Sequence, residues 1–427
     1  MTLLKTTIPC AVMVVLLGAC QALYSSSPED APYWPRFQGS NADNISTDTG
    51  LLTQWPEGGP RLIWTVDGIG EGFAGVVMAN GMIYTAGNVD GKMTITALDM
   101  DGNMRWQIAN GDAYEKDYPG ARGTPTLDGD RLYHESPDGR LACFNAVTGK
   151  EIWSLNILDE FDGKQTQWAL AESILIDGDR LICCPGGAKT AVVALDKMTG
   201  KTVWKSPSAS GDLASYASPT LIEYKGLRII LTMTDSALIG VNADNGELLF
   251  QHAHPTKYKV NALMPVFRDG HILTSSGYGT TGSVLVKLDV DGDKASVEQV
   301  WQSLDLDNHH GGVVVWEGHV YGAAHSSGKS RWVCLDWKTG ETKYSEKGVG
   351  KGPVTFADGM LYTMSENRDV GLVKATPESH DVISRFEIPR QGKGKSWAHP
   401  VVCGGRLYIR HGDYLYAYDV KNHVSGP

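Results

Sequence analysis

The stretch ALDKMTGKTVW, from Ala194 to Trp204, decides the fold, because degenerate copies of it recur along the chain. A second clear copy, CFNAVTGKEIW, runs from Cys143 to Trp153. Weaker copies end at Trp106, Phe250, Trp301 and Tyr344. In the Asp-x-x-Thr-Gly core of the unit, Asp and Thr bond nearby backbone and Gly accepts a positive φ. The unit therefore predicts two strands joined by a tight turn, with a closing aromatic side chain that packs between neighbouring sheets.

Two landmarks recur eight times each, and their spacing identifies the architecture. The closing aromatics are Trp64, Trp106, Trp153, Trp204, Phe250, Trp301, Tyr344 and Phe386. The turn glycines are Gly81, Gly129, Gly178, Gly226, Gly270, Gly318, Gly359 and Gly405. Both sets have a period of about 46 residues, the size of one four-stranded blade. Because short β-branched and aromatic runs lie between the turns, we predict an all-β, eight-bladed β-propeller with four-stranded antiparallel blades.

The phase of the repeat predicts how the ring closes. Trp64 has no blade before it, and the last blade, about 401–419, has only three strands. We expect residues 60–64 to supply its missing outer strand, so that pairing of the N- and C-terminal strands leaves no open edge. The predicted divisions are a signal peptide (1–20), a tether and N-terminal extension (21–59), the propeller (60–421) and a tail (422–427).

Residues 1–20 have the pattern of a targeting segment. Lys5 precedes an apolar stretch, 9–17, that is too short to span a bilayer as a helix. The sequence LGAC, ending at Cys20, resembles the lipobox of bacterial lipoproteins. The resemblance implies cleavage before Cys20, a lipid on its sulfur, and a place on the periplasmic face of the outer membrane or on the cell surface. An ordinary secretory signal is the alternative.

Charge and cysteine content narrow the class of partner. The net charge is -11 and no basic run occurs, which argues against a nucleic-acid partner.

The cysteines after Cys20 are odd in number and have no spacing typical of a disulfide scaffold: Cys143, Cys183, Cys184, Cys334 and Cys403. Cys143 and Cys334 stand where sister repeats carry Ala, so we expect small buried side chains. Cys183 and Cys184 form either a vicinal disulfide or, in better agreement with a strand, two thiols. A monomer is expected.

The repeat unit resembles the tryptophan-docking motif of PQQ-dependent alcohol dehydrogenases, and equally that of the propeller lipoprotein of the outer-membrane barrel-assembly machinery. The segments WPRFQG (34–39), WPEGGP (55–60), NHHGG (308–312) and WAHP (397–400) are similar to a subgroup of PQQ-like repeat proteins. The dehydrogenase branch implies PQQ with calcium, but its calcium ligands and catalytic Asp match no motif of this chain. We therefore expect no cofactor, and a PQQ-dependent alcohol dehydrogenase-like oxidoreductase is the alternative.

Two further motifs fail on their context. Residues 277–282 match the dinucleotide fingerprint, but a strand, 284–286, follows where a helix is required. Residues 289–293 begin like a calcium loop, but Val300 stands where the bidentate Glu belongs. We predict a loop for the first and a strand-connecting turn for the second.

A propeller site is expected where two loops of each blade meet: the loop that leads into the innermost strand (the leading loop) and the turn between the second and third strands. Here these loops are aromatic, basic and imidazole-bearing, which predicts a pocket for a polar or anionic small molecule, or an interaction surface with anchors. The predicted ligand-binding residues are Arg122, Trp168, Tyr216, Asn261, Tyr278, His309, His310, Lys351, Trp397 and His399. The same loops carry Phe73, Asn88, Glu135, Lys189, His325, Glu366 and Arg410.

Several of these residues have a structural alternative. Trp168 and Trp397 are also suited to plugging the channel. Adjacent His309 and His310 side chains face different ways in a strand, so no metal site is predicted.

Basic groups that converge on one axis require a counter-charge. Arg122 and Lys351 would repel each other without an anion or a carboxylate, which Glu135 or Glu366 is placed to supply.

Three functions are compatible with the sequence. The first is a non-catalytic ligand-binding or protein-scaffolding module at the envelope, whose partner is an envelope protein or a small polar ligand. The second is the quinoprotein oxidoreductase. The third is a hydrolase or lyase with His309, His310 or His399 as general base.

Overall fold

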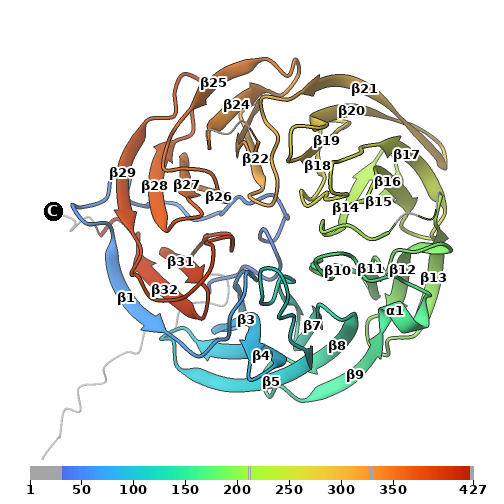
Figure 1. The fold of residues 1–427 in the computed structure, drawn as a ribbon, viewed down its shortest axis with the longest axis horizontal. Helices are drawn as coiled ribbons and strands as arrows, with labels where there is room; N and C mark the ends of the chain where they lie inside the picture. Colours follow the sequence, from blue (N-terminus) through green and yellow to red (C-terminus); the bar gives the residue numbers. More distant parts are fainter. Residues whose placement is uncertain (1–30, 210, 212, 327–329, 424–427) are drawn as a thin grey trace, which may run out of the picture.

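The computed structural model describes residues 31–209, 211, 213–326 and 330–423. Eight four-stranded antiparallel sheets surround a common axis (Figure 1), which confirms the predicted propeller. A single helical turn, α1 (Ile157–Glu160), lies among these described residues. No described helix has the length and apolar character needed to cross a bilayer. The predicted signal peptide and Cys20 lie outside the described residues.

The first four blades follow one another in sequence. Blade 1 contains β2 (Val77–Ala79), β3 (Met82–Val89), β4 (Lys92–Asp99) and β5 (Met104–Asp112). Blade 2 contains β6 (Thr126–Asp128), β7 (Arg131–Glu135), β8 (Arg140–Asn145) and β9 (Glu151–Asn156). Blade 3 contains β10 (Leu175–Asp177), β11 (Arg180–Cys183), β12 (Thr190–Asp196) and β13 (Thr202–Pro207). Blade 4 contains β14 (Thr220–Tyr224), β15 (Leu227–Met233), β16 (Ala237–Asn242) and β17 (Leu248–Ala253).

The last four blades complete the ring. Blade 5 contains β18 (Val266–Arg268), β19 (His271–Ser276), β20 (Gly282–Asp291) and β21 (Lys294–Ser303). Blade 6 contains β22 (Val313–Trp316), β23 (His319–Ala323), β24 (Trp332–Asp336) and β25 (Thr342–Glu346). Blade 7 contains β26 (Val354–Ala357), β27 (Met360–Met364), β28 (Asp369–Lys374) and β29 (Val382–Glu387). Blade 8 contains β30 (Val401–Cys403), β31 (Arg406–His411), β32 (Tyr414–Asp419) and, from the other end of the chain, β1 (Arg61–Val66).

Blade 8 is a composite of both ends of the chain, as predicted. Strand β1 pairs antiparallel with β32, and Arg61 faces Asp419 in the register. The guanidinium of Arg61 also meets the Asp419 carboxylate at 2.7 Å. Figure 1 shows β1, in blue, on the rim beside the red β32. The ring is therefore closed by β-pairing between the two ends of the chain.

The closing tryptophans dock five of the eight blades onto the next one, and blades 4, 6 and 7 end in Phe250, Tyr344 and Phe386 instead. The indole Nε1 of Trp106 in blade 1 donates to the carbonyl of Ala146 in blade 2, at 3.1 Å. The ring lies over Gly149, where an added Cβ would stand 2.9 Å from it, and where φ is 70°. Four further pairs repeat this indole-to-carbonyl bond: Trp64 to Met100, Trp153 to Lys197, Trp204 to Ala243 and Trp301 to Trp337. The repeat motif thus explains blade packing.

The N-terminal extension packs against the ring and closes one end of its axis. Trp34 pairs with Met78 of blade 1, and both backbone N–H···O bonds between them are 2.8 Å long. Farther along, the N–H of Phe356 in blade 7 donates to the carbonyl of Asn44 at 2.8 Å. Figure 1 shows the blue chain crossing the centre of the ring between these blades. Residues 34–44 therefore form a floor under the axis.

The predictions for the cysteines and for the two rejected motifs are also met by the fold. Cys143 and Cys334 are fully buried, and Cys183 and Cys184 are buried free thiols. The dinucleotide-like segment leads into β20 rather than a helix, and residues 289–293 contain the end of β20 and the two-residue turn to β21. Both motifs are strand connections, as expected.

Candidate functional site

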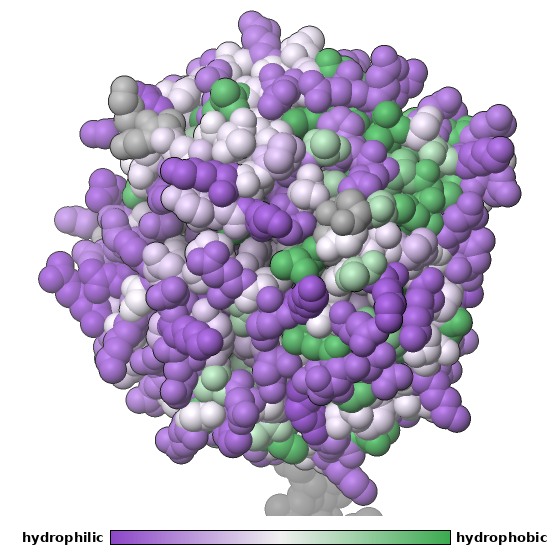
Figure 2. Space-filling model, turned by 45° about the vertical axis from the view of Figure 1, so that its right-hand side comes forward, coloured by the Kyte–Doolittle hydropathy of each residue, from purple (hydrophilic) through white to green (hydrophobic). Residues whose placement is uncertain are grey.

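A cavity of about 440 Å³ opens at the end of the ring where the leading loops meet, here called the funnel face. All the predicted ligand-binding residues except Asn261 line it: Arg122, Trp168, Tyr216, Tyr278, His309, His310, Lys351, Trp397 and His399. Phe73, His325 and Glu366, from the same sets of loops, line it too. This cavity is called the funnel pocket. Hydrophilic side chains cover most of the surface drawn in Figure 2, and apolar ones form only small groups.

Asn261 does not reach the funnel pocket. Its side chain is fully buried, and its amide Nδ2 donates to the carbonyls of Thr234 at 2.9 Å and His254 at 3.2 Å. These bonds hold the leading loop of blade 5 against blade 4. An asparagine side chain can bind a ligand, but the amide Nδ2 of Asn261 donates to backbone carbonyls instead.

Four other loop residues also lie outside the pocket. Asn88 donates to the carbonyl of Tyr114 at 2.8 Å, and Lys189 pairs with Asp162 at 3.0 Å on the surface. Glu135 and Arg410 are buried between blades. Glu135 is therefore not the counter-charge of Arg122 or Lys351.

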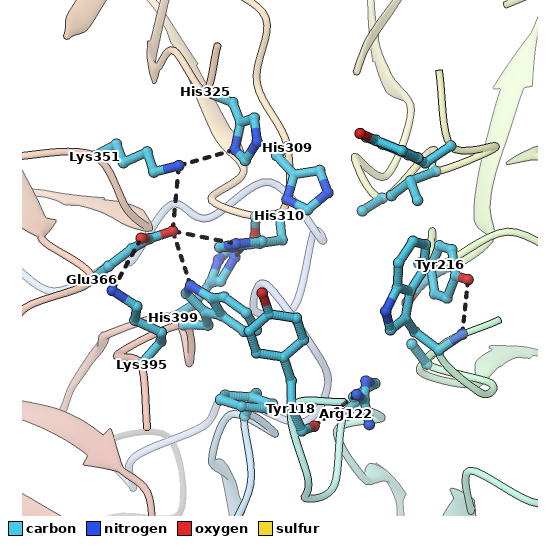
Figure 3. A pocket seen from close by; sticks show the side chains of 18 of the residues that line it. Tyr118, Arg122, Tyr216, His309, His310, His325, Lys351, Glu366, Lys395 and His399 are labelled. Atoms are coloured by element: carbon cyan, nitrogen blue, oxygen red, sulfur yellow. Dashed lines mark hydrogen bonds and ion pairs between the residues drawn. The ribbon is translucent and has the colours of Figure 1, made fainter. Parts of the chain in front are cut away.

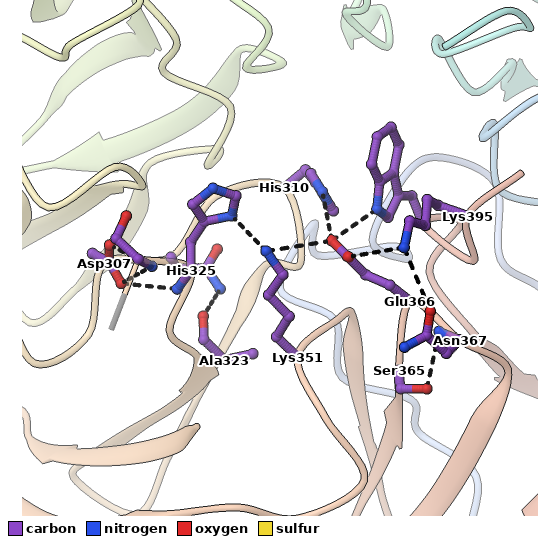
Figure 4. Close-up of polar contacts among 12 residues, drawn as sticks. Asp307, His310, Ala323, His325, Lys351, Ser365, Glu366, Asn367 and Lys395 are labelled. Atoms are coloured by element: carbon purple, nitrogen blue, oxygen red, sulfur yellow. Dashed lines mark hydrogen bonds and ion pairs between the residues drawn. The ribbon is translucent and has the colours of Figure 1, made fainter. Parts of the chain in front are cut away.

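One side of the funnel pocket gathers cationic groups around one carboxylate (Figure 4). The Glu366 carboxylate accepts a hydrogen bond from Trp397 Nε1 at 3.0 Å. Lys351 Nζ lies 3.7 Å from it, and Lys395 Nζ lies 3.8 Å from it. His310 Nε2 is also 3.8 Å away. Because two lysines share one carboxylate, this side, called the basic wall, keeps a surplus positive charge.

Three imidazole rings, including His310 of the basic wall, lie in contact with one another. The ring centroid of His309 lies 4.7 Å from that of His310 and 4.6 Å from that of His325. Burial, and then the neighbouring His325 and Lys351, lower the pKa of His309 to about 3. Burial likewise holds the pKa of His310 well below its ordinary value. These rings are neutral at pH 7, so the charge of the wall belongs to its lysines. Within the described residues no group of His, Cys, Asp and Glu is arranged to hold a metal ion.

His399 belongs to the floor of the pocket. Its Nδ1 lies 3.2 Å from Asn44 Oδ1, and its Nε2 lies 2.9 Å from the carbonyl oxygen of His310. The edge of Phe37 packs on its ring at a centroid distance of 5.0 Å. Burial lowers its pKa to about 4. With both nitrogens in contact with structural partners, His399 joins the N-terminal extension to the ring.

Arg122 lies away from the basic wall (Figure 3). Its guanidinium donates to the carbonyls of Gly120 at 3.0 Å and Tyr118 at 2.8 Å, and covers the Tyr114 ring at 4.4 Å. Burial lowers its pKa, but a guanidinium stays charged at pH 7. In the described part of the chain no carboxylate forms an ion pair with it. Arg122 adds a second uncompensated positive charge to the funnel pocket.

The opposite side of the pocket is aromatic and is called the aromatic wall. Trp168 and Tyr216 lie with ring centroids 6.1 Å apart, and the backbone N–H of Trp168 donates to Tyr216 Oη at 3.2 Å. Tyr258 and Tyr278 meet edge to face at 4.8 Å. Figure 3 shows Tyr216 across the open space from Lys351 and Glu366. Trp168 therefore lines the pocket and does not plug it.

Sequence reasoning missed several lining residues: Phe37, Tyr118, Gln167, Tyr258 and Lys395. Tyr118, Gln167, Tyr258 and Lys395 stand in leading loops, but away from the position that the other blades use. Phe37 belongs to the N-terminal extension, which has no counterpart in the repeat. A count of the residues between each outer strand and the next innermost strand would have shown that these loops are long enough to supply additional side chains.

A buried carboxyl pair, outside the lining, lies between blades 2 and 3. Glu172 Oε1 accepts the backbone N–H of Cys184 at 2.8 Å. Neither oxygen of Glu135 has a hydrogen-bond partner among the described residues. Burial, and then the charge of Glu172, hold the pKa of Glu135 well above its usual range, and burial raises the pKa of Glu172 to about 7. The two carboxyls therefore retain protons that free carboxyls would lose.

We predict that Glu135→Gln stabilises the fold at pH 8 and changes little at pH 5. Because both folded-state pKa values are raised, the unfolded chain releases these protons first, and the free energy of unfolding falls as pH rises above about 4.5. Glu135→Gln removes that ionisation and is expected to gain about 1–3 kcal/mol at pH 8. Urea unfolding at pH 5 and pH 8 measures this change in the free energy of unfolding. Glu341→Gln is the control, because Glu341 is exposed. An equal effect at both pH values would contradict the raised pKa of Glu135.

The docked blades and the closed ring define the class of protein: a propeller built from PQQ-like repeats. The family profile described as outer membrane protein assembly factor BamB matches residues 43–157 and 91–346. The chain belongs to this family. No curated protein sequence matches it.

Solved structures share the architecture at low sequence identity. BamB from Moraxella catarrhalis superposes with a TM-score of 0.60 at 14% identity, covering 84% of this chain and 99% of that one. Quinohemoprotein alcohol dehydrogenase from Comamonas testosteroni gives 0.66 at 14% identity, covering 93% and 82%. A europium-containing methanol dehydrogenase gives 0.61 at 12% identity, covering 90% of each chain. These similarities establish the fold, while the site decides the function.

The dehydrogenase neighbours raise the question of whether this pocket suits PQQ with calcium. Calcium takes six to eight oxygen ligands, mostly carboxylates and carbonyls. The lining contains one carboxylate, Glu366, whose oxygens are already shared by Lys351, Lys395 and the Trp397 indole. A donor set of cations and imidazoles does not fit a calcium ion.

Proposed function

We propose that the protein is a non-catalytic binding or scaffolding propeller of the cell envelope, which holds a polar or anionic ligand or a partner's group in its funnel pocket. One observation carries the proposal: the pocket is positive in an acidic protein. Arg122, Lys351 and Lys395 line it against the single carboxylate of Glu366, while the whole chain has a net charge of -11. Like charges that converge on one cavity favour a bound anion.

The lowered pKa values of the pocket histidines support a binding function over a hydrolytic one. A general base works best with a pKa near the operating pH. The pKa of His309 is lowered to about 3 and that of His399 to about 4, in both cases first by burial. Such rings are poor bases at neutral pH, so the hydrolase or lyase alternative loses its catalytic group.

The path of the N-terminal extension supports a membrane-anchored arrangement with the funnel pocket turned outward. Pro32 packs against Gly404, where an added Cβ would lie 2.6 Å from it. Gly404 is in the turn between β30 and β31, at the end of blade 8 opposite the funnel face. The residues from Cys20 to Pro32 span at most about 40 Å. A lipid on Cys20 would therefore hold the opposite end of the ring nearest the membrane.

Native mass spectrometry tests the proposal while the ligand is still unidentified. The protein is purified from its own cells without denaturation, alongside Lys351→Glu and a control, Lys201→Glu. Lys201 is exposed and lies at the end of β12 away from the funnel face. We expect a bound mass on the wild type and on the control, and its loss from Lys351→Glu.

Two results would overturn this function. The first is that the wild type, Lys351→Glu and Lys201→Glu are all observed without a bound ligand. The other is alcohol-dependent dye reduction after PQQ and Ca²⁺ are added, which would establish the quinoprotein oxidoreductase instead.

A further inference from the structure

The funnel pocket has two chemically unlike sides. The basic wall contains Lys351, Lys395, Glu366 and His310, beside the ring of Trp397. The aromatic wall contains Trp168, Tyr216, Tyr258 and Tyr278, and Tyr278 borders the basic wall through its contact with His325. Figure 3 shows Tyr216 of the aromatic wall across the open space from Lys351 and Glu366 of the basic wall. A ligand that satisfies only one of the two walls would leave the other in contact with water.

The lysines of the basic wall carry more donors than the neighbouring acceptors of the protein satisfy. Lys351 Nζ has His325 Nδ1 at 3.2 Å and only a shared carboxylate oxygen of Glu366 at 3.7 Å. Neither ring nitrogen of His309 has a hydrogen-bond partner among the described residues, although a neutral imidazole carries one N–H. An anionic oxygen at this wall would accept charge-assisted hydrogen bonds, which are about twice as strong as neutral ones.

The aromatic wall is fixed and suited to a flat ring. Its rings meet in two pairs, at 6.1 Å for Trp168 and Tyr216 and at 4.8 Å for Tyr258 and Tyr278, and the backbone N–H of Trp168 positions the Tyr216 hydroxyl. Val260 and Ala262 fill the surface beside them. Aromatic pairs at such distances attract each other beyond the effect of the apolar area that they bury.

The shape of the cavity favours a small molecule over a polypeptide. Its volume of about 440 Å³ lies in the range of small-molecule sites. Phe37 and His399 close its floor, so a chain cannot pass through the ring. A ligand must fit between the floor and the mouth.

We infer that the funnel pocket takes a small molecule with a flat aromatic ring at one end and a single anionic group, a carboxylate or a phosphate, at the other. The anion lies on Lys351 and the ring lies on Trp168. This inference rests on the proposed function and names the class of ligand for that site.

Calorimetric titration of the full-length protein with a matched probe series tests the inference. The probes are 3-phenylpropionate, phenyl phosphate, the neutral 3-phenylpropanol and the ringless propionate. We expect one site per chain, with the ring-bearing anions binding about tenfold or more tightly than 3-phenylpropanol and propionate. The tighter of the two ring-bearing anions identifies the anionic group.

The variants separate the two walls. Lys351→Met is expected to weaken 3-phenylpropionate about tenfold and to leave 3-phenylpropanol unchanged, while Trp168→Leu weakens both. Lys201→Met, away from the funnel, changes neither. Far-UV circular dichroism verifies that each variant is folded, and Tyr258→Leu replaces Trp168→Leu if that variant unfolds.

Failure of the inference differs from failure of the proposed function. Equal affinity for 3-phenylpropionate and either propionate or 3-phenylpropanol would overturn the inference, as would no binding of any probe. A bound mass on the wild type that Lys351→Glu lacks would then still uphold the binding function.

Discussion

Removal of residues 1–66 is expected to abolish the folded propeller instead of shortening it. The deletion takes away β1, which pairs with β32 and completes blade 8. It also removes Trp34 and Trp55, which are buried, and Trp64, whose indole docks on the Met100 carbonyl. At about 3–5 kcal/mol for each tryptophan, the loss equals the whole stability of about 5–15 kcal/mol of a typical protein.

Thermal unfolding followed by circular dichroism measures this effect. Deletion of residues 1–30 is the matched control, because it retains every described contact of the ring, and its melting temperature should equal that of the full chain. Cooperative unfolding of the chain without residues 1–66, near the wild-type melting temperature, would show that the ring closes without β1.

Arg410→Met is expected to cost about 3 kcal/mol or more of the free energy of unfolding, because each buried group left without a partner costs about 1–3 kcal/mol. The guanidinium is buried where blade 8 meets blade 1, and no carboxylate within the described residues pairs with it. Its donors meet the carbonyl oxygens of Gly70, Ala74, Ala86 and Gly412 and the hydroxyl of Thr85. The methionine fills the space but leaves these buried acceptors without donors.

Urea unfolding monitored by tryptophan fluorescence measures the cost. Arg61→Met is the control, because Arg61 makes a surface ion pair with Asp419 with 72% of its side chain exposed, and such pairs contribute about 0–1 kcal/mol. A loss for Arg410→Met no larger than that of Arg61→Met would mean that water replaces the guanidinium at no cost.

The sequence predicted the fold because a propeller repeats one local solution. Docking of the kind seen for Trp106 over Gly149 needs a glycine turn and a closing aromatic, which most blades repeat, so the motif and its period are visible without an alignment. The assembly of blade 8 from both ends of the chain followed from where the repeats begin, since Trp64 precedes the first complete repeat.

The position of a residue in the loops predicted which blades contribute to the site, but not which of the loop side chains reach the pocket. Loop position brought Lys351 and Glu366 to one cavity, but it assigned the same role to Asn261 and raised Glu135 as a counter-charge. Those two side chains are buried between blades: backbone carbonyls accept the Asn261 amide, and Glu135 lies near the second carboxyl of Glu172. Whether a loop side chain turns toward the axis depends on its neighbours in three dimensions, which the repeat does not encode.

The floor of the pocket lay beyond sequence reasoning for a related reason. Phe37 belongs to the extension, whose route across the axis depends on pairing with strands far along the chain. No periodic signal marks such a segment.

The structure of the protein with 3-phenylpropionate bound is the decisive measurement for the funnel pocket. We expect one molecule in the pocket, with its carboxylate at hydrogen-bond distance from Lys351 Nζ and its ring against Trp168. A molecule bound outside the pocket, or one whose carboxylate points toward the aromatic wall, would contradict the roles given to the two walls.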